Sequence, residues 1–404
     1  MTVAEAPEFS QLTSIAVGGR PRVLLSPPQP QQLVEAALET WSGGEEWMFL
    51  GGGSNLVVSD DGFEGTVIRV VTSGIEPFES LRRDRLPGAP SRLRVQAGER
   101  WDDVVAYTVE QGWSGIETLS GIPGSSGAAP IQNIGAYGQE LSSSLIAVDF
   151  LDYLTGQRQR VPASELGLGY RTSALKQGRR GLVISIDLGL TESVGALSEP
   201  VRYAQLASAL GVSVGARVPL AELRTAVLAL RAAKGMLLSA EDPDSVSAGS
   251  FFTNPIVSEN FARGLPADAP RWPITPEQPP AVAPLPEYLL SVPRDSFRSS
   301  AVSDSARVAR PATMEARITR PATTSEYLVK LSAAWLIEHS GIRRGFSLPG
   351  SKAAVSSKHT LALVNTGGAT ADQVAELARY VRSCVLNEFG VRLQPEPALV
   401  GLQL

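Results

Sequence analysis

Short apolar runs alternate with glycine-containing turns along the first part of the chain. Residues 22–26, 47–50, 65–70 and 92–97 are rich in β-branched residues or have apolar residues at alternate positions. This pattern predicts short strands, because successive side chains of a strand point to opposite faces of a sheet.

Other segments have apolar residues at spacings of three and four. Residues 30–40 and 101–111 have this pattern with acidic residues in or near the first turn, as amphipathic helices do. Strand-rich runs then cover 145–160 and 181–191, and residues 220–234 predict a strong helix. Strands that alternate with helices favour an α/β or α+β fold.

The regular pattern ends near Gly264 and returns at Tyr327. The run "YLVKLSAAWLIEHSG" predicts a helix, "TLALVN" a strand and residues 370–389 a long helix before a final strand. Between 264 and 324 the chain is rich in proline, serine, alanine and arginine without periodicity, which indicates a mobile insertion. A tolerated surface loop and a docking segment for partners both remain open for this insertion.

A chain of 404 residues is too long for one ordinary core. We expect a first subdomain at 1–70, completed by the C-terminal residues 391–404. A second subdomain is expected at 71–235, and a third domain at 236–390 that carries the insertion.

Composition narrows the class of protein. Hydrophobic residues make up 43% and charged residues 19%, and the net charge of −5 gives no general attraction to nucleic acid. One cysteine, Cys384, excludes an internal disulfide, and only His339 and His359 are present as histidines, so no metal site is expected.

The N-terminal residues 1–9 lack the basic and apolar regions of a signal peptide, and no long apolar run suggests a membrane span. We therefore expect a cytoplasmic protein, without membrane insertion, that acts as a monomer on small molecules.

Two glycine-rich loops are candidates for holding phosphate groups. Three glycines, Gly51–Gly53, follow an apolar run and precede Ser54 and Asn55, and a longer loop runs from Gly121 to Gly138. Glycine lets backbone amides approach a phosphate closely. A tight turn is the alternative for the first loop alone, and the spacing differs from the G-x-G-x-x-G turn of a Rossmann fold. The candidate cofactor-binding residues are Gly51, Gly52, Gly53, Ser54, Asn55, Gly121, Ile122, Pro123, Gly124, Ser126, Gly127, Ala128, Gln132, Asn133, Gly135 and Ala136.

These loops and "AGERWDDVV" resemble the FAD-binding half of vanillyl-alcohol-oxidase-type proteins, most closely the UDP-N-acetylenolpyruvoylglucosamine reductases. The resemblance runs from "TSIAVGG" to "LQPEPALVG" and omits only the insertion. It implies a two-part FAD-binding module with a smaller C-terminal α/β substrate-binding domain. It also implies noncovalent FAD, NADPH as reductant, and reduction of an enolpyruvyl ether on a UDP-sugar in peptidoglycan precursor synthesis.

The resemblance assigns catalytic roles to three residues in separate motifs. Ser250 in "AGSFFTNP" would donate a proton, while Arg171 in "YRTSALK" and Glu396 in "LQPEP" would act on the substrate carboxylate or its protonated form. Taken alone, the serine is a common strand-end residue and the two charged residues are common surface groups. Their joint occurrence carries the hypothesis.

The resemblance also gives candidate substrate-binding residues: Tyr137, Tyr170, Tyr203, Lys234 and Asn254. Lys234 and Asn254 match contacts to the pyrophosphate, and Tyr203 matches a tyrosine of a closing loop in one subclass. Packing of Tyr203 at a helix start is the alternative. An FAD-dependent sugar or alcohol oxidase of the same fold and a flavin-carrying scaffold protein are the two alternative functions.

Overall fold

The computed structural model describes residues 6–78, 90–274 and 327–404. The chain divides into two compact units, of which the first holds residues 1–255 with 332–404 and the second holds residues 256–331. None of the described helices is long and apolar enough to cross a membrane. Most of the predicted insertion lies outside the described residues.

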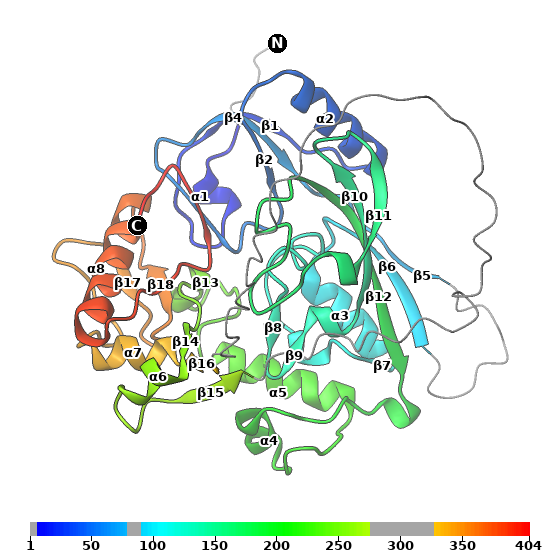
Figure 1. The fold of residues 1–404 in the computed structure, drawn as a ribbon. Coiled ribbons are helices and arrows are strands. Elements are labelled where there is room, and N and C mark those ends of the chain that lie inside the picture. The colour runs from blue at the N-terminus through cyan, green and yellow to red at the C-terminus, as the bar shows by residue number, and fades with distance from the viewer. Residues whose placement is uncertain (1–5, 79–89, 275–326) are drawn as a thin grey trace, which may run out of the picture. The chain divides into compact units, whose positions relative to one another are not determined.

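A three-stranded parallel sheet lies near the start of the first unit. Its order is β1 (Pro21–Leu25), β4 (Phe63–Arg69) and β2 (Trp47–Leu50). Helix α2 (Pro30–Ser42) packs on this sheet and on the neighbouring one, and its Leu33 and Ala37 are fully buried (Figure 1). Proline at the first helical position suits the start of α2, since that position needs no backbone N–H bond.

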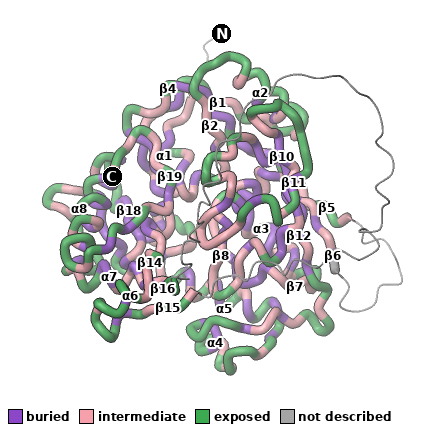
Figure 2. The backbone as a smooth tube through the Cα atoms, viewed as in Figure 1, coloured by how far each residue is buried: buried purple, intermediate pink, exposed green. Residues whose placement is uncertain are grey.

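An antiparallel sheet forms the larger core of this unit. Its order is β11 (Arg158–Pro162), β10 (Leu145–Asp152), β12 (Gly181–Glu192), β6 (Pro90–Gln96) and β5 (Ile75–Phe78), and β7 (Trp113–Ser114) also pairs with β12. The middle of β12 is buried residue after residue, including the polar side chains of Ser185 and Asp187 (Figure 2). Helix α3 (Trp101–Glu110) covers the core with its buried Trp101.

The C-terminal part of the first unit has a small antiparallel sheet in the order β13 (Ser247–Ser250), β18 (Ala362–Asn365) and β17 (Ala353–Val355). Helices α7 (Ala333–His339) and α8 (Ala371–Phe389) accompany it. A capping box between Thr370 and Gln373 starts α8, and Gly390 ends it with φ 68°. Such a cap stabilises a helix by about 1 kcal/mol.

The chain end returns to the N-terminal region, because β19 (Ala398–Val400) pairs in parallel with β3 (Leu56–Val58). The remaining helices and strands of this unit are α1 (Phe9–Leu12), β8 (Gly135–Ala136), β9 (Gln139–Glu140), α4 (Ala204–Leu210) and α5 (Leu220–Ala232). Its short 3₁₀ turns are η1 (Glu117–Leu119), η2 (Leu141–Ser143), η3 (Ala163–Glu165), η4 (Val194–Ala196) and η5 (Pro243–Ser245).

The second unit is an antiparallel sheet in the order β14 (Ile256–Ser258), β16 (Leu328–Leu331) and β15 (Arg271–Ile274). Helix α6 (Glu259–Arg263) follows β14, and the Ser258 side chain caps its start. Strand β15 lies inside the segment that the sequence predicts as irregular.

Most predicted elements are confirmed, including the strand at 47–50 and the long final helix. The prediction of one helix beginning at Tyr327 is wrong, because residues 328–331 form β16 before α7 begins at Ala333. In "YLVKLSAAWLIEHSG" the alternation of "LVKL" is a strand signal, and Ser332 caps the helix by accepting from the Trp335 N–H.

A buried asparagine joins the two ends of the first unit. The Asn365 Nδ2 donates to the carbonyls of Ile15 at 3.2 Å and Ala16 at 3.0 Å, and its Oδ1 accepts from Gly367 and Ala369, both at 2.9 Å. Asn365 is only 6% exposed, so water cannot replace these partners after truncation.

We predict that Asn365→Ala lowers the free energy of unfolding by at least about 2 kcal/mol, because buried backbone groups lose their partners. Urea unfolding followed by circular dichroism measures the change. Asn387→Ala, on the exposed face of α8, is the matched control and should change the stability by less than about 0.5 kcal/mol. Equal effects of the two substitutions would contradict the structural role of Asn365.

Candidate active site

The two glycine-rich loops predicted from the sequence lie against each other. A Cβ atom on Gly52 would lie 2.6 Å from the Gly124 Cα, closer than any real contact. The Ser54 hydroxyl donates to the Pro123 carbonyl at 3.0 Å. Glycine at position 52 is therefore required by backbone contact between the loops.

The second loop is hydrogen-bonded to the turn between β6 and α3. The Ser126 N–H and hydroxyl both donate to the Glu99 carbonyl, at 2.8 and 3.1 Å, and the Gly127 N–H donates to the Ala97 carbonyl at 2.7 Å. Ser126 is completely buried. Its hydroxyl therefore supports the loop from inside.

An open cavity of about 350 Å³ lies where the loops meet β2 and β12. Its lining is mainly apolar and includes Trp47, Phe49, Gly51, Gly127, Ala128, Phe150 and Leu182. The cavity can receive a largely apolar group beside backbone amides of the glycine loops.

The structure brings Arg171 and Glu396 together from distant parts of the chain. The Arg171 Nε lies 3.2 Å from the Glu396 Oε1, and both side chains are mostly buried, with exposed fractions of 20% and 14%. The Arg171 Nη2 donates to the Gly135 carbonyl at 2.7 Å, and Nη1 to the Asn133 carbonyl at 3.5 Å. These bonds fix the guanidinium beside the second glycine loop.

Two amides complete the surroundings of Glu396. The Gln132 Nε2 donates to the Glu396 Oε1 at 3.3 Å, and the Asn55 Nδ2 donates to the Gln132 Oε1 at 2.9 Å. Burial raises the pKa of Glu396, whereas Arg171, Lys176 and the hydrogen bond from Gln132 lower it. Burial outweighs these neighbours, so the pKa of Glu396 lies above its usual value.

Ser250 ends β13 next to the segment that carries Glu396. The Glu396 N–H donates to the carbonyl of Phe251 at 2.9 Å, and the Phe251 N–H donates to the Leu361 carbonyl at 2.7 Å. Phe251 and Phe252 are buried as a pair and anchor this strand in the core. The Ser250 hydroxyl forms no hydrogen bond to any residue in the described part of the chain. It is thus available to a ligand.

Tyr170 and Asn254 meet beside this group. The Asn254 N–H donates to the Tyr170 hydroxyl at 3.3 Å, and the Asn254 Oδ1 accepts from the Ala333 N–H at 2.9 Å. The Arg171 guanidinium carbon lies 5.3 Å from the Tyr170 ring centroid. Burial raises the pKa of the Tyr170 phenol, so this hydroxyl stays protonated at neutral pH.

Tyr137, Tyr203 and Lys234 form a second group. The rings of Tyr137 and Tyr203 are 5.6 Å apart in an edge-to-face arrangement, and the Lys234 Nζ lies 5.7 Å from the centre of the Tyr137 ring. Lys234 also donates to the Gln205 Oε1 at 3.0 Å, which ties it to α4. Burial, followed by the charge of Arg231, lowers the pKa of Lys234.

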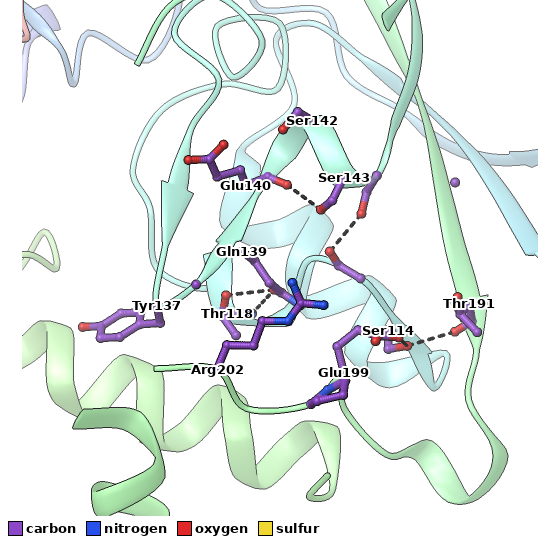
Figure 3. A pocket seen from close by; sticks show the side chains of 15 residues that line it. Ser114, Thr118, Tyr137, Gln139, Glu140, Ser142, Ser143, Thr191, Glu199 and Arg202 are labelled. Atoms are coloured by element: carbon purple, nitrogen blue, oxygen red, sulfur yellow. Dashed lines mark hydrogen bonds between the residues drawn. The ribbon is translucent and has the colours of Figure 1, made fainter. Parts of the chain in front are cut away.

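A second cavity, of about 470 Å³, is lined in part by residues of the β8–β9 hairpin and by serine, threonine and glutamate side chains. Figure 3 shows the Arg202 side chain reaching into it and Tyr137 at its edge. Since Arg202 immediately precedes Tyr203, this cavity borders the segment that is predicted to close over a nucleotide.

Most of the site residues predicted from the sequence therefore lie in two groups within the first unit. Arg171, Glu396, Gln132 and Asn55 share hydrogen bonds or ion pairs, and the backbone places Ser250 next to them. The Asn133 side chain is completely buried and bonded to Glu140, Gly169 and Ser142, and Ile122 and Ala136 pack on the core. The ligand roles of all these residues stay predictions.

Three further residues were missed by the sequence reasoning. Lys176 lies within the quoted motif "YRTSALK", and its ammonium reaches Gln132 and Glu396. Arg231 is buried in α5 with an Nε that has no hydrogen-bond partner in the described part of the chain. His359 is buried, and the positive charge of Lys234 lowers its pKa. Only Lys176 had a sequence signal, its five-residue spacing from Arg171.

We predict that His359 makes the protein sensitive to acid. Burial, followed by the charges of Lys234 and Arg344, lowers its pKa from 6.5 to about 4, against the opposing charge of Glu338 and with a further contribution from Arg231. The unfolded chain thus binds a proton at a higher pH than the folded chain does. Stability is lost as the pH falls from about 6.5 to about 4.

His359→Gln should flatten this pH dependence, which urea unfolding at several pH values in the same interval measures. His339, the other histidine of the chain, is exposed on α7, so His339→Gln is the control. An unchanged pH dependence in His359→Gln would show that other groups cause the acid sensitivity.

Comparisons with known proteins identify the two domains of the chain and its fold. Residues 21–161 match an FAD binding domain, and residues 242–400 match the C-terminal domain of UDP-N-acetylenolpyruvoylglucosamine reductase. The crystal structure of the UDP-N-acetylenolpyruvylglucosamine reductase of Thermus caldophilus has the same fold, with a TM-score of 0.56 and 23% identity over 98% of this chain and 97% of that one.

Full-length relatives are more similar in sequence. The UDP-N-acetylenolpyruvoylglucosamine reductase of Leifsonia xyli subsp. xyli is 56% identical over 100% of both chains. That of Saccharopolyspora erythraea is 43% identical over 97% of this chain and 94% of the relative. Identity of this extent over the whole length shows that the chain belongs to the UDP-N-acetylenolpyruvoylglucosamine reductase family.

Proposed function

We propose that Arg171, Glu396 and Ser250 carry out the reductive step of this family's reaction. Family membership makes the chain an FAD-containing oxidoreductase that reduces UDP-N-acetylenolpyruvoylglucosamine in peptidoglycan synthesis, with NADPH as the reductant. The observation that carries the residue assignment is the Arg171–Glu396 ion pair, whose glutamate is bonded through its backbone to the residue after Ser250.

The glycine loops fit FAD. A Cβ atom on Gly51 would lie 2.5 Å from the Ser125 Oγ, and one on Gly52 would strike Gly124, so the absence of side chains lets the two loops pack directly against each other. The backbone of such a pair of loops would remain close enough to a ligand to contact it. Backbone amides of such loops can bind a pyrophosphate without basic side chains. Gly51, Gly127 and Ala128 would hold the cofactor at the adjoining apolar cavity. When bound there, FAD would supply the hydride transfer between NADPH and the terminal carbon of the enolpyruvyl group.

Arg171 is suited to hold the substrate carboxylate. Its guanidinium has five N–H groups. Nη2 and Nη1 each direct one N–H to a carbonyl, that of Gly135 and that of Asn133, and Nε forms the ion pair with Glu396. One N–H on each terminal nitrogen therefore remains for a bidentate contact. Its positive charge, next to the carboxyl of Glu396, would stabilise the negative charge that develops beside the substrate carboxylate.

Ser250 would complete the reduction. Hydride addition to the terminal carbon leaves an electron pair on the adjacent carbon, and the Ser250 hydroxyl would protonate that carbon, so that one hydride and one proton saturate the double bond. The resulting alkoxide then recovers a proton from solvent. Phe251 and Phe252 keep the serine in place because they anchor the following residues in the core.

The second group of residues suits the nucleotide end of the substrate. Lys234 offers a positive charge and Tyr137 and Tyr203 offer aromatic faces within one cluster. Tyr170 and Asn254 lie between this end and the carboxylate site in the proposal, as polar groups that orient the pyrophosphate and sugar. Tyr203 is 45% exposed, which leaves it room to move.

We further propose that the enzyme acts as a monomer in the cytoplasm, where NADPH and UDP-sugars are available. We retain the division into 1–70 with 391–404, 71–235 and 236–390 as a proposal, and the pairing of β19 with β3 supports the assignment of the chain end to the first part.

We predict that Ser250→Ala separates the two half-reactions. Flavin reduction by NADPH should stay within about twofold of the wild type, whereas flavin reoxidation by the enolpyruvyl substrate should slow by about 10²–10⁴-fold, the usual contribution of a general acid. Stopped-flow absorbance of the flavin measures both steps. Ser383→Ala, on the exposed side of α8, is the control, and equal slowing of both half-reactions would contradict the assignment.

We also predict that Gly52→Ala reduces FAD binding, because the added Cβ would lie 2.6 Å from the Gly124 Cα and push the loops apart. The Kd for FAD should rise at least about tenfold, a loss of roughly 1.4 kcal/mol in binding, which titration of the apoprotein and the ratio of flavin absorbance to protein measure. Gly43→Ala is the control, since a Cβ there meets its nearest atom at 3.4 Å. Normal flavin content in Gly52→Ala would exclude this loop from the cofactor site.

A further inference from the structure

The side chains of Lys176 and Asn55 donate to the same two oxygen atoms beside the Arg171–Glu396 ion pair. The Lys176 Nζ lies 3.4 Å from the Gln132 Oε1 and 3.4 Å from the Glu396 backbone carbonyl. The Asn55 Nδ2 lies 2.9 Å from the same Gln132 oxygen and 3.4 Å from the same carbonyl. Lys176 and Asn55 thus bridge Gln132 and Glu396 from residues far apart in the sequence.

This arrangement fixes the orientation of the Gln132 side chain. An amide has an acceptor end and a donor end, and a rotation of 180° would turn the NH₂ group toward the Asn55 amide and the Lys176 ammonium, which are both donors. The acceptor end must therefore face these two residues. As a consequence the Nε2 points to the Glu396 Oε1, where the distance is 3.3 Å.

We propose that Lys176 is a positioning residue, which together with Asn55 locks the Gln132 amide so that it directs its N–H to Glu396 beside Arg171. The inference rests on the proposed role of Glu396. The residue as a whole is exposed, yet its ammonium end reaches inward to the two oxygens. Lys176 thereby acts through Gln132 and carries no reacting atom.

The electrostatics agree with this geometry. The segment 170–176 presents Tyr170, Arg171 and Lys176 to Glu396, while Gln132 and Asn55 from the glycine loops are neutral. Arg171, Lys176 and Gln132 all lower the pKa that burial raises. Removal of Lys176 removes one charge and loosens one hydrogen bond, so both effects favour the protonated carboxyl.

Infrared difference spectroscopy tests the proposal on the FAD-containing enzyme. The band of the protonated Glu396 carboxyl is identified by its loss in Glu396→Gln and is then followed as a function of pH. We expect its titration midpoint to move to higher pH in Lys176→Met and to stay near the wild-type value in Lys176→Arg, which keeps the charge and the donors. Lys352→Met, an exposed lysine before β17, is the control.

A double substitution tests whether Lys176 acts through Gln132. Lys176→Met should shift the midpoint less in a Gln132→Leu background than in the wild type, because the amide it orients is gone. Equal shifts in both backgrounds would show that Lys176 acts by charge alone and would overturn the positioning role. An unchanged midpoint in Lys176→Met overturns the whole proposal. Both readings come from the carboxyl band and need no turnover, so they are independent of the proposed function.

Kinetics then connect the position of Glu396 to the reaction. Flavin reoxidation by the enolpyruvyl substrate should slow about tenfold to a hundredfold in Lys176→Met at neutral pH, with its pH profile displaced in the same direction as the midpoint. Flavin reduction by NADPH serves as the check on folding. A raised KM with an undisplaced profile would mean that Lys176 binds the substrate itself and would contradict the proposal. A displaced carboxyl midpoint with normal reoxidation would instead contradict the role of Glu396 in the proposed function.

Discussion

A carboxylate taken out of water next to a guanidinium constrains the arrangement of the whole site. Burial of two charges costs several kcal/mol per ion, and their attraction offsets this only when hydrogen bonds satisfy the remaining donors and acceptors. The Arg171–Glu396 pair meets that condition through the carbonyl of Gly135 and the amide of Gln132. Arg171 donates to the carbonyls of Gly135 and Asn133, and Glu396 accepts from Gln132, so both partners of the pair depend on the second glycine-rich loop.

The backbone around this pair adopts conformations that most residues avoid. Asn133, Tyr137 and Arg171 have φ values of 47°, 48° and 54°. A non-glycine residue in this region costs about 1 kcal/mol or more unless its surroundings hold it there. The Asn133 amide, bonded on three sides, and the Arg171 guanidinium supply such support. Rigidity here is consistent with a site that must orient a substrate for hydride and proton addition to adjacent carbons.

The sequence predicted the elements with clear periodicity and the residues with recognisable motifs. The α8 helix follows from its apolar spacing and its capping residues, and the run at 47–50 is a strand as expected. The helix expected from Tyr327 failed because a short strand and a helix share one apolar run, which periodicity alone cannot divide. Nothing in the sequence indicated that Lys176 and Asn55 share two acceptors. Residues 55, 132, 176 and 396 are far apart along the chain, and only folding brings them together.

The short segment from 133 to 137 links the two groups of the site. Arg171 bonds to the carbonyl of Gly135, and two residues later Tyr137 contacts Tyr203 and Lys234. A substrate bound at Tyr137 and Lys234 would therefore meet Arg171 at a separation set by two residues of a β-hairpin. Binding of the nucleotide end can then help to position the reacting carbons, because the segment 133–137 that connects the two groups is conformationally restricted. The geometry explains why a small enolpyruvyl group would be presented on so large a nucleotide.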